Sequence, residues 1–511
     1  MEGNMSSPTC LLGIDVGTES CKAIVFNERG ESLARSYREH PTLIPHASWA
    51  EQDPYLWWEN VVEVVSDVVK AVRSSSRRIA CVTVTGQSPV LVAVDKFGSP
   101  LMNAIVWMDR RAVDQSRTVA RLAGLAEDPS MILPKILWIK EKQPHVYQKT
   151  YKFLQATDFI GYKITGTFAT DWFSAFTCHF DLESRRWPEE ILEHLDIPLE
   201  RFPEVFRPTE ILGAITQEAS HKTGLEKGVP VVAGGIDAYM AVIGANALRE
   251  GSACEITGSS TCLMVPSRRK IADRKGRIAS AIFPLLPHLF ITWAVMSSTG
   301  ASLRWFRDRF GHSEESFEDL DREAEKVSAG ADGLIFLPYM MGERSPIWSP
   351  SARGVLAGLS LHHTRNHVIR AILEGCAFGI RHNMEIIEES GGRIDEIRSC
   401  GGAARSTVFG QIKADVTGKP IVIPRETEAP ALGAAISGAV AVGVHKDIKE
   451  AAENMVQVKY RIDPRKVLSN RYDLAFRMYK DVYSHLKEYF NRYYSPSNDS
   501  LPARDEPKWR P

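Results

Sequence analysis

The chain has 511 residues, of which 44% are hydrophobic and 24% charged, and its formal net charge is -1. This length exceeds one compact core and suits a globular protein of two domains. The balanced charge excludes a long-range attraction to nucleic acid or an anionic membrane, and no apolar run approaches the roughly 20 residues that span a bilayer. We therefore expect neither a nucleic-acid partner nor a membrane.

The ends of the chain and its cysteines indicate the compartment. Residues 1–9 lack the basic-then-apolar layout of a signal peptide. Residues 495–511 are rich in Pro, Ser and charge, and we predict that both ends are disordered. The eight cysteines are scattered and include no CxxC pair, which is typical of reduced thiols in a cytoplasmic protein.

The elements predicted in chain order alternate between strands and helices. Residues 10–15 and 21–26 read as apolar strands around a tight turn, and residues 55–74 carry apolar positions at helical spacing. Residues 79–84 and 230–235 are two further buried strands, the second followed by a helical segment. This order predicts an α/β fold with a largely covered sheet.

A similar pattern then begins again. Gly17-Thr-Glu-Ser-Cys21 aligns with Gly258-Ser-Ser-Thr-Cys262, and apolar runs flank both segments. We interpret this as a duplicated core with a boundary near residues 247–251. The later predicted elements are strands at 334–337 and 397–400, a helix with a small-residue face at 367–388, and a final helix from after 468 to about 493.

Four turns rich in glycine or small residues follow apolar strands, at residues 15–18, 234–237, 257–260 and 401–404. Glycine lets the backbone approach a ligand and direct successive N–H groups at phosphate oxygens. One such turn is usually only the end of a strand, but four with paired hairpins favour a nucleotide site. Neither a P-loop nor a G-x-G-x-x-G motif is present, so the nucleotide must be held in another way.

Three polar residues beside these turns suit phosphoryl transfer, which needs donors around the phosphates, a metal anchor and a base. Lys22 could neutralise a transferring phosphoryl group, and Asp15 could hold a water of hydrated Mg²⁺. Asp237 follows a strand and precedes a helix, where it is either the base or a helix N-cap. The isolated segment does not decide between these two roles.

A second polar group follows the strand at 79–84. It consists of Gln87, Trp107, Asp109 and Arg110, and its amide and carboxylate are suited to reading the hydroxyls of a polyol. Asp109 could equally form a structural ion pair with a neighbouring arginine.

Three stretches of the chain resemble the FGGY family of carbohydrate kinases. Residues 354–375 fit the second family signature throughout, and residues 49–58 are also typical of these kinases. The first signature lies around residues 135–141, although Ile132 stands where the pattern expects Pro, Ser or Thr. The resemblance runs from about residue 11 to residue 490.

The resemblance implies a two-domain actin-like ATPase (ribonuclease H-like) fold with a duplicated core and an interdomain cleft. Residues 10–248 would bind the sugar and carry the base, residues 249–494 would bind ATP, and a homodimer is possible within the family. Asp237 falls on the family's catalytic base, and Asp15 lies on its first phosphate hairpin. The residues implied for ATP are Thr18, Lys22, Gly258, Ser259, Gly300, Arg304, Gly401, Gly402, Arg405 and Ser406.

The sugar itself is less defined by the sequence. We expect Gln87, Ser88 and Asp109 to contact it together with Asp237. Glycerol kinases carry Arg-Glu where this chain has Ser88-Pro89, and xylulokinases usually read Gln-Met-His where it has Gln87-Ser-Pro. A ketopentose such as D-xylulose is the first choice, with other pentuloses, tetritols, pentitols and gluconate left open. A rival hypothesis is an ATP-binding regulator of the same fold that phosphorylates no sugar.

Overall fold

The computed structural model describes residues 9–494 apart from residues 47, 74–76, 125–126 and 313. This part of the chain divides into two compact units. The first unit comprises Met1–Arg249, Ile282–Phe290 and Pro424–Lys459, and the second comprises Glu250–Ala281, Ile291–Ile423 and Tyr460–Pro511. The predicted disordered ends lie outside the described residues, except that Thr9 already begins the first strand.

The first unit contains a six-stranded sheet in the order β11-β12-β5-β1-β2-β3. β1 pairs in parallel with β5, and β5 in parallel with β12, whereas β2, β3 and β11 run antiparallel to their neighbours. The strands are β1 (Thr9–Val16), β2 (Ser20–Asn27), β3 (Ser32–Glu39), β5 (Arg78–Gly86), β11 (Ile211–Ala214) and β12 (Pro230–Ile236).

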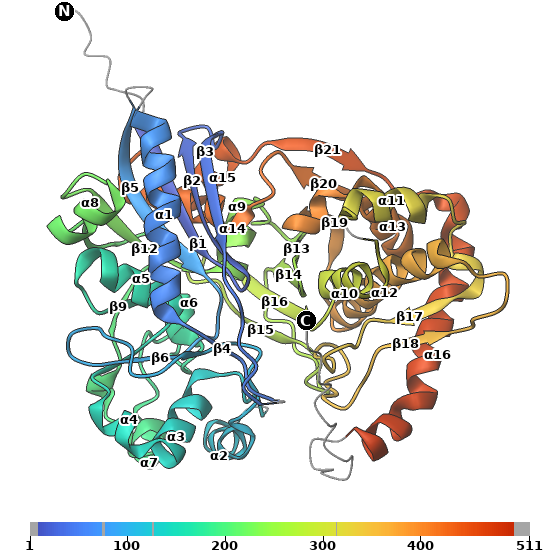
Figure 1. Cartoon of the computed structure of the whole chain (residues 1–511), viewed down its shortest axis with the longest axis horizontal. Coiled ribbons are helices and arrows are strands. Elements are labelled where there is room, and N and C mark those ends of the chain that lie inside the picture. Colours follow the sequence, from blue (N-terminus) through green and yellow to red (C-terminus); the bar gives the residue numbers. More distant parts are fainter. Residues whose placement is uncertain (1–8, 47, 74–76, 125–126, 313, 495–511) are drawn as a thin grey trace, which may run out of the picture. The chain divides into compact units, whose positions relative to one another are not determined.

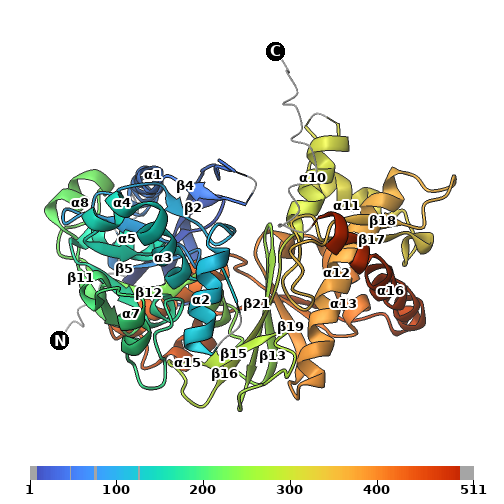
Figure 2. The same ribbon diagram turned by 90° about the horizontal axis from the view of Figure 1, so that it is seen from below.

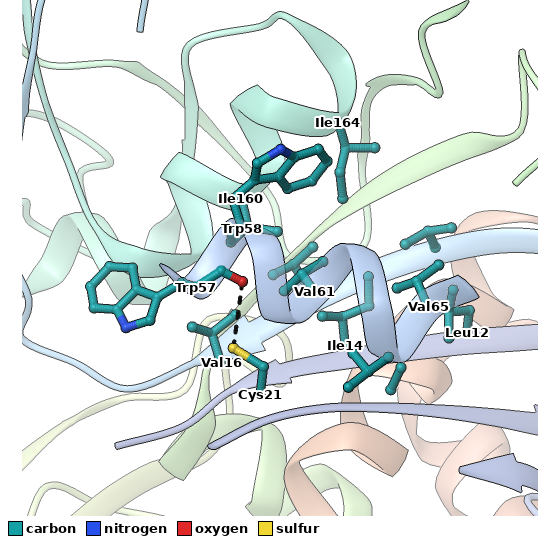
Figure 3. Close-up of a cluster of buried hydrophobic side chains, with 14 of the residues drawn as sticks. Leu12, Ile14, Val16, Cys21, Trp57, Trp58, Val61, Val65, Ile160 and Ile164 are labelled. Atoms are coloured by element: carbon teal, nitrogen blue, oxygen red, sulfur yellow. Dashed lines mark hydrogen bonds between the residues drawn. The ribbon is translucent and has the colours of Figure 1, made fainter. Parts of the chain in front are cut away.

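Alternation along β1 assigns its side chains to two faces of this sheet. Leu12, Ile14 and Val16 pack in the core with Trp57 and Val61 of α1 (Pro54–Arg73) (Figure 3). On the opposite face Gly13 meets the backbone of α14 (Ala429–Ala441), because a Cβ there would lie 2.3 Å from the Ala431 carbonyl oxygen. Asp15 follows the same alternation and therefore lies on the α14 face.

The remaining elements of the first unit cover this sheet or form a group beyond one of its ends (Figure 1). Its other helices are α2 (Val113–Ala123), α3 (Ile132–Lys142), α4 (Pro144–Lys149), α5 (Ala156–Thr165), α6 (Trp172–Phe176), α7 (Glu189–His194), α8 (Gln217–Thr223), α9 (Asp237–Gly244) and α15 (Ile448–Met455). Of these helices, α2, α3, α4 and α7 belong to the group beyond the end of the sheet. Its two-stranded pairs are β4 (Glu51–Gln52) with β7 (Ala104–Ile105), β6 (Val92–Val94) with β8 (Lys152–Leu154), and β9 (Ala169–Asp171) with β10 (Glu204–Phe206).

The second unit is built around a seven-stranded sheet in the order β15-β16-β14-β13-β19-β20-β21. The strands are β13 (Gly251–Thr257), β14 (Thr261–Ser267), β15 (Ala279–Ile282), β16 (Phe290–Met296), β19 (Ile394–Cys400), β20 (Ile421–Pro424) and β21 (Val458–Ile462). The unit also contains β17 (Ile335–Leu337), β18 (Val355–Ala357), α10 (Gly300–Phe310), α11 (Phe317–Glu325), α12 (Arg365–Glu389), α13 (Thr407–Thr417) and α16 (Ser469–Tyr493). Apolar side chains of α12, α13 and β19 share one core cluster, and these elements lie beside one another in Figure 2.

The predicted duplication is confirmed by the strand pairing. β1 and β2 form an antiparallel hairpin whose first strand pairs in parallel with β5, and β13 and β14 form a hairpin whose first strand pairs in parallel with β19. The hairpins differ by one residue in register, since Val16 pairs with Cys21 while Thr257 pairs with Thr261. Each unit thus begins its sheet with the same supersecondary structure.

The packing of Pro424–Lys459 differs from the linear division at residue 248. The sequence assigned all of 249–494 to one C-terminal domain, yet this segment packs within the first unit. The reason is glycine contact between helices: a Cβ at Gly433 of α14 would lie 1.8 Å from the Met240 carbonyl oxygen of α9. Such close helix packing across nearly two hundred residues of chain is not visible as a sequence pattern.

No helix in the described part of the chain is long and apolar enough to cross a membrane.

Candidate active site

The carboxyl ends of three parallel strands bring the predicted base and sugar residues to one edge of the first unit's sheet. Gly86 at the end of β5 pairs with Val16 of β1 and with Ile236 of β12. Asp15 lies at the end of β1, and Gln87 and Asp237 directly follow the other two strands. Open sheets with parallel strands bind ligands at this edge, so the strand topology places these three residues where chemistry is expected.

Asp237 is the first residue of α9, and it does not cap that helix. The N-cap is Ile236, and Asp237 Oδ1 accepts a hydrogen bond from the adjacent Ala238 N–H at 2.7 Å. Burial raises the pKa of Asp237 to about 7, and the charge of Asp15 adds to this rise, whereas Ala238 N–H and Lys22 oppose it. A carboxylate with a pKa near neutrality has the basicity that general-base catalysis requires.

The turn predicted at residues 234–237 is instead the end of β12. Gly234 and Gly235 lie inside the strand, next to a register shift against β5. Gly234 has φ +68° and a Cβ there would lie 2.1 Å from the Val84 carbonyl oxygen. Only glycine fits this close approach, which sets the direction in which the chain reaches Asp237.

Asp15 and Lys22 face each other across the first hairpin and meet a third charged residue. They are register partners on β1 and β2, with Asp15 Oδ2 3.9 Å from Lys22 Nζ. Lys22 Nζ also donates to Glu428 Oε2 at 2.6 Å. Burial raises the pKa of Asp15 to about 6, with Lys22 opposing and Glu428 adding to the shift. Among the described residues, no group donates a hydrogen bond to the buried Asp15 Oδ1.

Glu428 is a residue of this site that the sequence analysis missed. It lies at the N-cap of α14, within the segment assigned from sequence to the other domain. The signal that could have found it is a Glu directly before the apolar small-residue helix Ala429–Ala441, since acidic residues are favoured at helix N-termini. It holds the Lys22 ammonium in place beside Asp15.

Gln87 and its neighbours connect the sugar residues with the first hairpin. The Trp107 indole N–H donates to Thr18 Oγ1 at 2.9 Å, so a residue predicted for ATP is in contact with one predicted to line the sugar site. Gln87 Nε2 donates to Gln52 Oε1 at 2.7 Å and to the Gly17 carbonyl oxygen at 3.3 Å. Gln52 lies on β4 and was not singled out from the sequence.

Ser88 lies in the same loop as Gln87, and its side chain is held by Gln155. Its hydroxyl donates to Gln155 Oε1 at 2.7 Å. The Gln155 amide in turn donates to the Ser174 carbonyl oxygen and to Thr177 Oγ1, at 2.5 and 2.8 Å. The side chain of Ser88 is therefore oriented by the buried amide of Gln155, a residue that the sequence analysis did not single out.

Asp109 forms the structural ion pair that the sequence left open. Its carboxylate is fully buried and is gripped by the guanidinium of Arg111, with contacts between 2.7 and 3.0 Å, while Oδ2 also accepts from Ala50 N–H at 2.6 Å. Arg111 contacts the rings of Trp49 and Trp138, at 3.7 and 5.0 Å from their centroids. A direct sugar contact by Asp109 would have to displace these partners.

Lys135 supports two of these segments from within the core. It lies on α3 and is fully buried, and its ammonium donates to the carbonyl oxygens of Pro89, Ile105 and Val106 at 2.9, 3.4 and 3.0 Å. Burial lowers the pKa of Lys135 to about 7, which the charge of Asp109 opposes. This side chain thus joins the loop after β5 to the loop after β7.

Lys135→Met is expected to destabilise the fold, because the partly buried Pro89 carbonyl would lose its donor at a cost of about 1–3 kcal/mol. At about 2–4 °C per kcal/mol for a domain of this size, the melting temperature should fall by roughly 2–12 °C in differential scanning calorimetry. Lys142→Met, at an exposed position of the same helix, is the matched control and should leave it unchanged. An unchanged melting temperature in Lys135→Met would show that the ammonium is not holding these loops.

The second unit gathers its predicted nucleotide residues around the turn between β13 and β14. Gly300 N–H donates to the Gly258 carbonyl oxygen at 3.1 Å, while Thr299 and Ala301 N–H groups both donate to the Ser259 carbonyl oxygen, at 2.9 and 3.0 Å. A Cβ at Gly300 would lie 2.2 Å from the Gly258 oxygen. The start of α10 is therefore bonded directly to the turn, and Arg304 follows one helical turn later.

The fourth predicted turn joins the same sheet edge. Gly401 follows β19, has φ +79°, and a Cβ there would lie 2.7 Å from the Thr257 carbonyl oxygen. Gly402 and Arg405 bound a short 3₁₀ helix, and Ser406 is the N-cap of α13, where its hydroxyl accepts from Phe409 N–H at 2.9 Å. All the nucleotide residues predicted beyond residue 250 thus lie in one unit, at the turn after β13, in the first turns of α10 and at the turn after β19.

Comparison with protein families agrees with both halves of this arrangement. The model of the N-terminal domain of the FGGY family of carbohydrate kinases matches residues 10–244, and the model of the C-terminal domain matches residues 254–442. The chain belongs to the FGGY family of carbohydrate kinases. The resemblance seen in the sequence is thereby confirmed, and the chain is an ATP-dependent carbohydrate kinase.

Individual relatives of this FGGY kinase match nearly its whole length. Xylulose kinase of Bacillus subtilis (strain 168) is 29% identical over 491 residues, which cover 94% of this chain and 97% of the relative. Gluconokinase of the same organism is 28% identical over 474 residues, covering 89% of this chain and 91% of the relative. Relatives with two different named substrates therefore lie at almost the same identity.

Solved structures confirm the predicted two-domain α/β fold. Xylulose kinase from Rhodospirillum rubrum matches with a TM-score of 0.80 and 29% identity, over 94% of this chain and 100% of that one. Gluconate kinase from Lactobacillus acidophilus matches with a TM-score of 0.85 and 25% identity, over 95% of this chain and 100% of that one.

Proposed function

We propose that this FGGY kinase transfers the γ-phosphoryl group of MgATP to a hydroxyl of a ketopentose such as D-xylulose, with Asp237 as the general base. The observation that carries the proposal is the placement of Asp237 at the carboxyl edge of the sheet with a pKa raised to about 7. A partly buried carboxylate of this basicity beside a second carboxylate and a lysine suits proton removal from an alcohol.

In the proposed reaction, Asp237 accepts the proton of the substrate hydroxyl as its oxygen attacks the γ-phosphorus. Lys22, held by Glu428 at 2.6 Å, supplies positive charge for the transferring phosphoryl group. The turns of the second unit bind the nucleotide through Gly258, Ser259 and the residues around Gly300 and Gly401. Each chain residue therefore binds, orients or moves a proton, and none forms a covalent intermediate.

A magnesium ion fits the donor chemistry beside Asp15. The buried Oδ1 of Asp15 has no hydrogen-bond donor in the described part of the chain, and carboxylate oxygens are ligands that Mg²⁺ prefers alongside water and phosphate. Asp15 would hold the ion directly or through a water. When bound, Mg²⁺ neutralises charge that develops on the phosphates.

The choice of a ketopentose rests on the xylulose kinases among the relatives and on Gln87, which this chain shares with the usual xylulokinase pattern. Ser88 and Pro89 replace the Met-His pair of that pattern and change which groups face the sugar. Other pentuloses, tetritols, pentitols and gluconate remain alternatives, gluconate because of the gluconokinase relatives.

A coupled ADP-release assay against ketoses, polyols and aldonates tests the proposal. We expect D-xylulose to give the highest kcat/KM of the panel. A higher kcat/KM with gluconate or a tetritol would identify that compound as the preferred substrate instead. ADP release that needs no sugar but responds to a protein partner would favour the regulator hypothesis instead.

The pH dependence should report Asp237 directly. A base acts only when deprotonated, so activity is present above its pKa and is lost as pH falls through it. The kcat/KM for the sugar should therefore fall about tenfold per pH unit below about pH 7. Asp15→Asn removes a charge that raises the pKa of Asp237. The pH at which kcat/KM begins to fall should therefore be lower in Asp15→Asn than in the wild type, even if the maximal kcat/KM also changes. A fall at the same pH in both proteins would contradict the coupling.

We also propose that the enzyme works in the cytoplasm as a homodimer with a small-molecule sugar as its ligand. None of the eight cysteines forms a disulfide, which supports a reducing compartment. Light scattering coupled to size-exclusion chromatography measures the oligomeric state.

A further inference from the structure

The amide of Gln87 is held by a chain of hydrogen bonds in which every donor and acceptor is chemically determined. The Trp57 indole N–H can only donate, and it donates to Gln52 Oε1 at 3.0 Å. The Thr18 carbonyl oxygen can only accept, and it accepts from Gln52 Nε2 at 2.7 Å. The orientation of the Gln52 amide is therefore fixed at both of its ends.

This orientation determines that of Gln87. Gln87 Nε2 donates to Gln52 Oε1 at 2.7 Å and to the Gly17 carbonyl oxygen at 3.3 Å, both of which are acceptors. A flipped Gln87 amide would bring its own oxygen against these two oxygens. Both glutamines have only 1% of their surface exposed, so the flipped state would bury these oxygen–oxygen contacts.

The amide oxygen of Gln87, Oε1, is the polar atom of the two glutamine amides that stays unpaired within the described part of the chain. Among the described residues it has no hydrogen-bond partner, although it is buried. Leaving a buried acceptor unpaired costs about 1–3 kcal/mol, which a ligand that supplies a donor would recover. Gln87 follows β5 at the sheet edge that carries Asp237, so the residue with the unpaired acceptor stands at the edge where the sugar is proposed to bind.

We propose that Gln52 is a positioning residue for substrate recognition, which restricts Gln87 to accepting a hydrogen bond from one substrate hydroxyl. This inference rests on the proposed function, since it names how that site reads its sugar. It also connects recognition to the first hairpin, because Gln52 and Gln87 both donate to carbonyl oxygens of its turn, those of Thr18 and Gly17. Thr42 Oγ1 takes the second amide hydrogen of Gln52 at 2.7 Å and completes its coordination.

The acceptor role of Gln87 can be tested on the wild-type enzyme with substrate analogues. At the hydroxyl that Gln87 reads, a deoxyfluoro analogue of the preferred substrate can accept but not donate, so it should be as poor as the deoxy analogue. Both should lose about 5- to 150-fold in kcat/KM, the range expected when a buried polar group is left unpaired. A fluoro analogue that retains the kcat/KM of the parent sugar would overturn the assignment of Gln87 as an acceptor.

Variants of the two glutamines then distinguish substrate contact by Gln87 from positioning by Gln52. Gln87→Met should make the enzyme indifferent between the parent sugar and the deoxy analogue at that position. Gln52→Leu frees the Gln87 amide to flip, so the fluoro analogue should gain relative to the deoxy analogue while the KM for ATP changes little.

Retention of full discrimination in a folded Gln52→Leu protein would overturn the positioning role, as would a deoxy series in which no position responds to Gln87→Met. If Gln52→Leu does not fold, the comparison of analogues on the wild-type enzyme still decides the polarity of Gln87. Failure of the proposed function is a different result, namely a wild-type enzyme that turns over no sugar of the panel.

Discussion

Replacing Asp237 with asparagine is expected to lower kcat by about 10²–10⁴-fold, the range attributed to a general base. Asparagine keeps the size of the side chain and can still accept a hydrogen bond from Ala238 N–H, which the carboxylate now accepts at 2.7 Å. It cannot take up the proton of the attacking hydroxyl. The affinity for ATP, measured by isothermal titration, should stay within a few-fold of wild type, since the nucleotide turns lie on other strands.

Asp114→Asn is a matched control for this substitution. Asp114 lies in the first turn of α2 with 84% of its side chain exposed and pairs with Arg117 at the surface. Its kcat should equal that of the wild type. Near-normal turnover in Asp237→Asn, with the control unchanged, would remove the assignment of Asp237 as the base.

Gly300→Ala is expected to raise the KM for ATP by about 5- to 150-fold. The new Cβ would lie 2.2 Å from the Gly258 carbonyl oxygen, which is part of the backbone and cannot rotate away. Overpacking of this kind costs about 1–3 kcal/mol, and here the strain falls on the turn proposed to hold the phosphates. Steady-state kinetics at varied ATP and saturating sugar measure the effect, with the KM for the sugar expected to remain near its wild-type value.

Gly161→Ala serves as the control for a glycine-to-alanine change. Gly161 lies within α5, and a Cβ there meets nothing within 4 Å, so its kinetics should match the wild type. An unaltered KM for ATP in Gly300→Ala would mean that the contact between α10 and the Gly258 turn does not shape the nucleotide site.

Much of the fold could be predicted because its cores are built from regular apolar patterns. The hairpin that contains Asp15 and the one that contains Gly258 were both visible as short apolar strands around small-residue turns. The helix predicted at residues 55–74 is found at Pro54–Arg73. What the pattern did not reveal was the return of Pro424–Lys459 to the first unit, because close packing of α14 on α9 depends on glycine contacts between distant segments.

The site could be predicted in part, for a related reason. Asp237, Asp15 and Gln87 directly end or follow strands, and strand ends are recognisable in a sequence. Glu428 and Gln52 act on those residues through contacts made across 406 and 35 positions of chain, which no local pattern encodes. Asp109 was predicted to contact the sugar but forms a buried ion pair with Arg111. A carboxylate beside two arginines has the same sequence in both cases, so the sequence cannot distinguish them.

The most direct test of the central claim is mass-spectrometric detection of the product after the purified protein is incubated with MgATP and D-xylulose. We expect one sugar monophosphate for each ADP formed by the wild-type protein, and at least about 10²-fold less of both in Asp237→Asn. ADP formed without a phosphorylated sugar, or equal product from the two proteins, would contradict this claim.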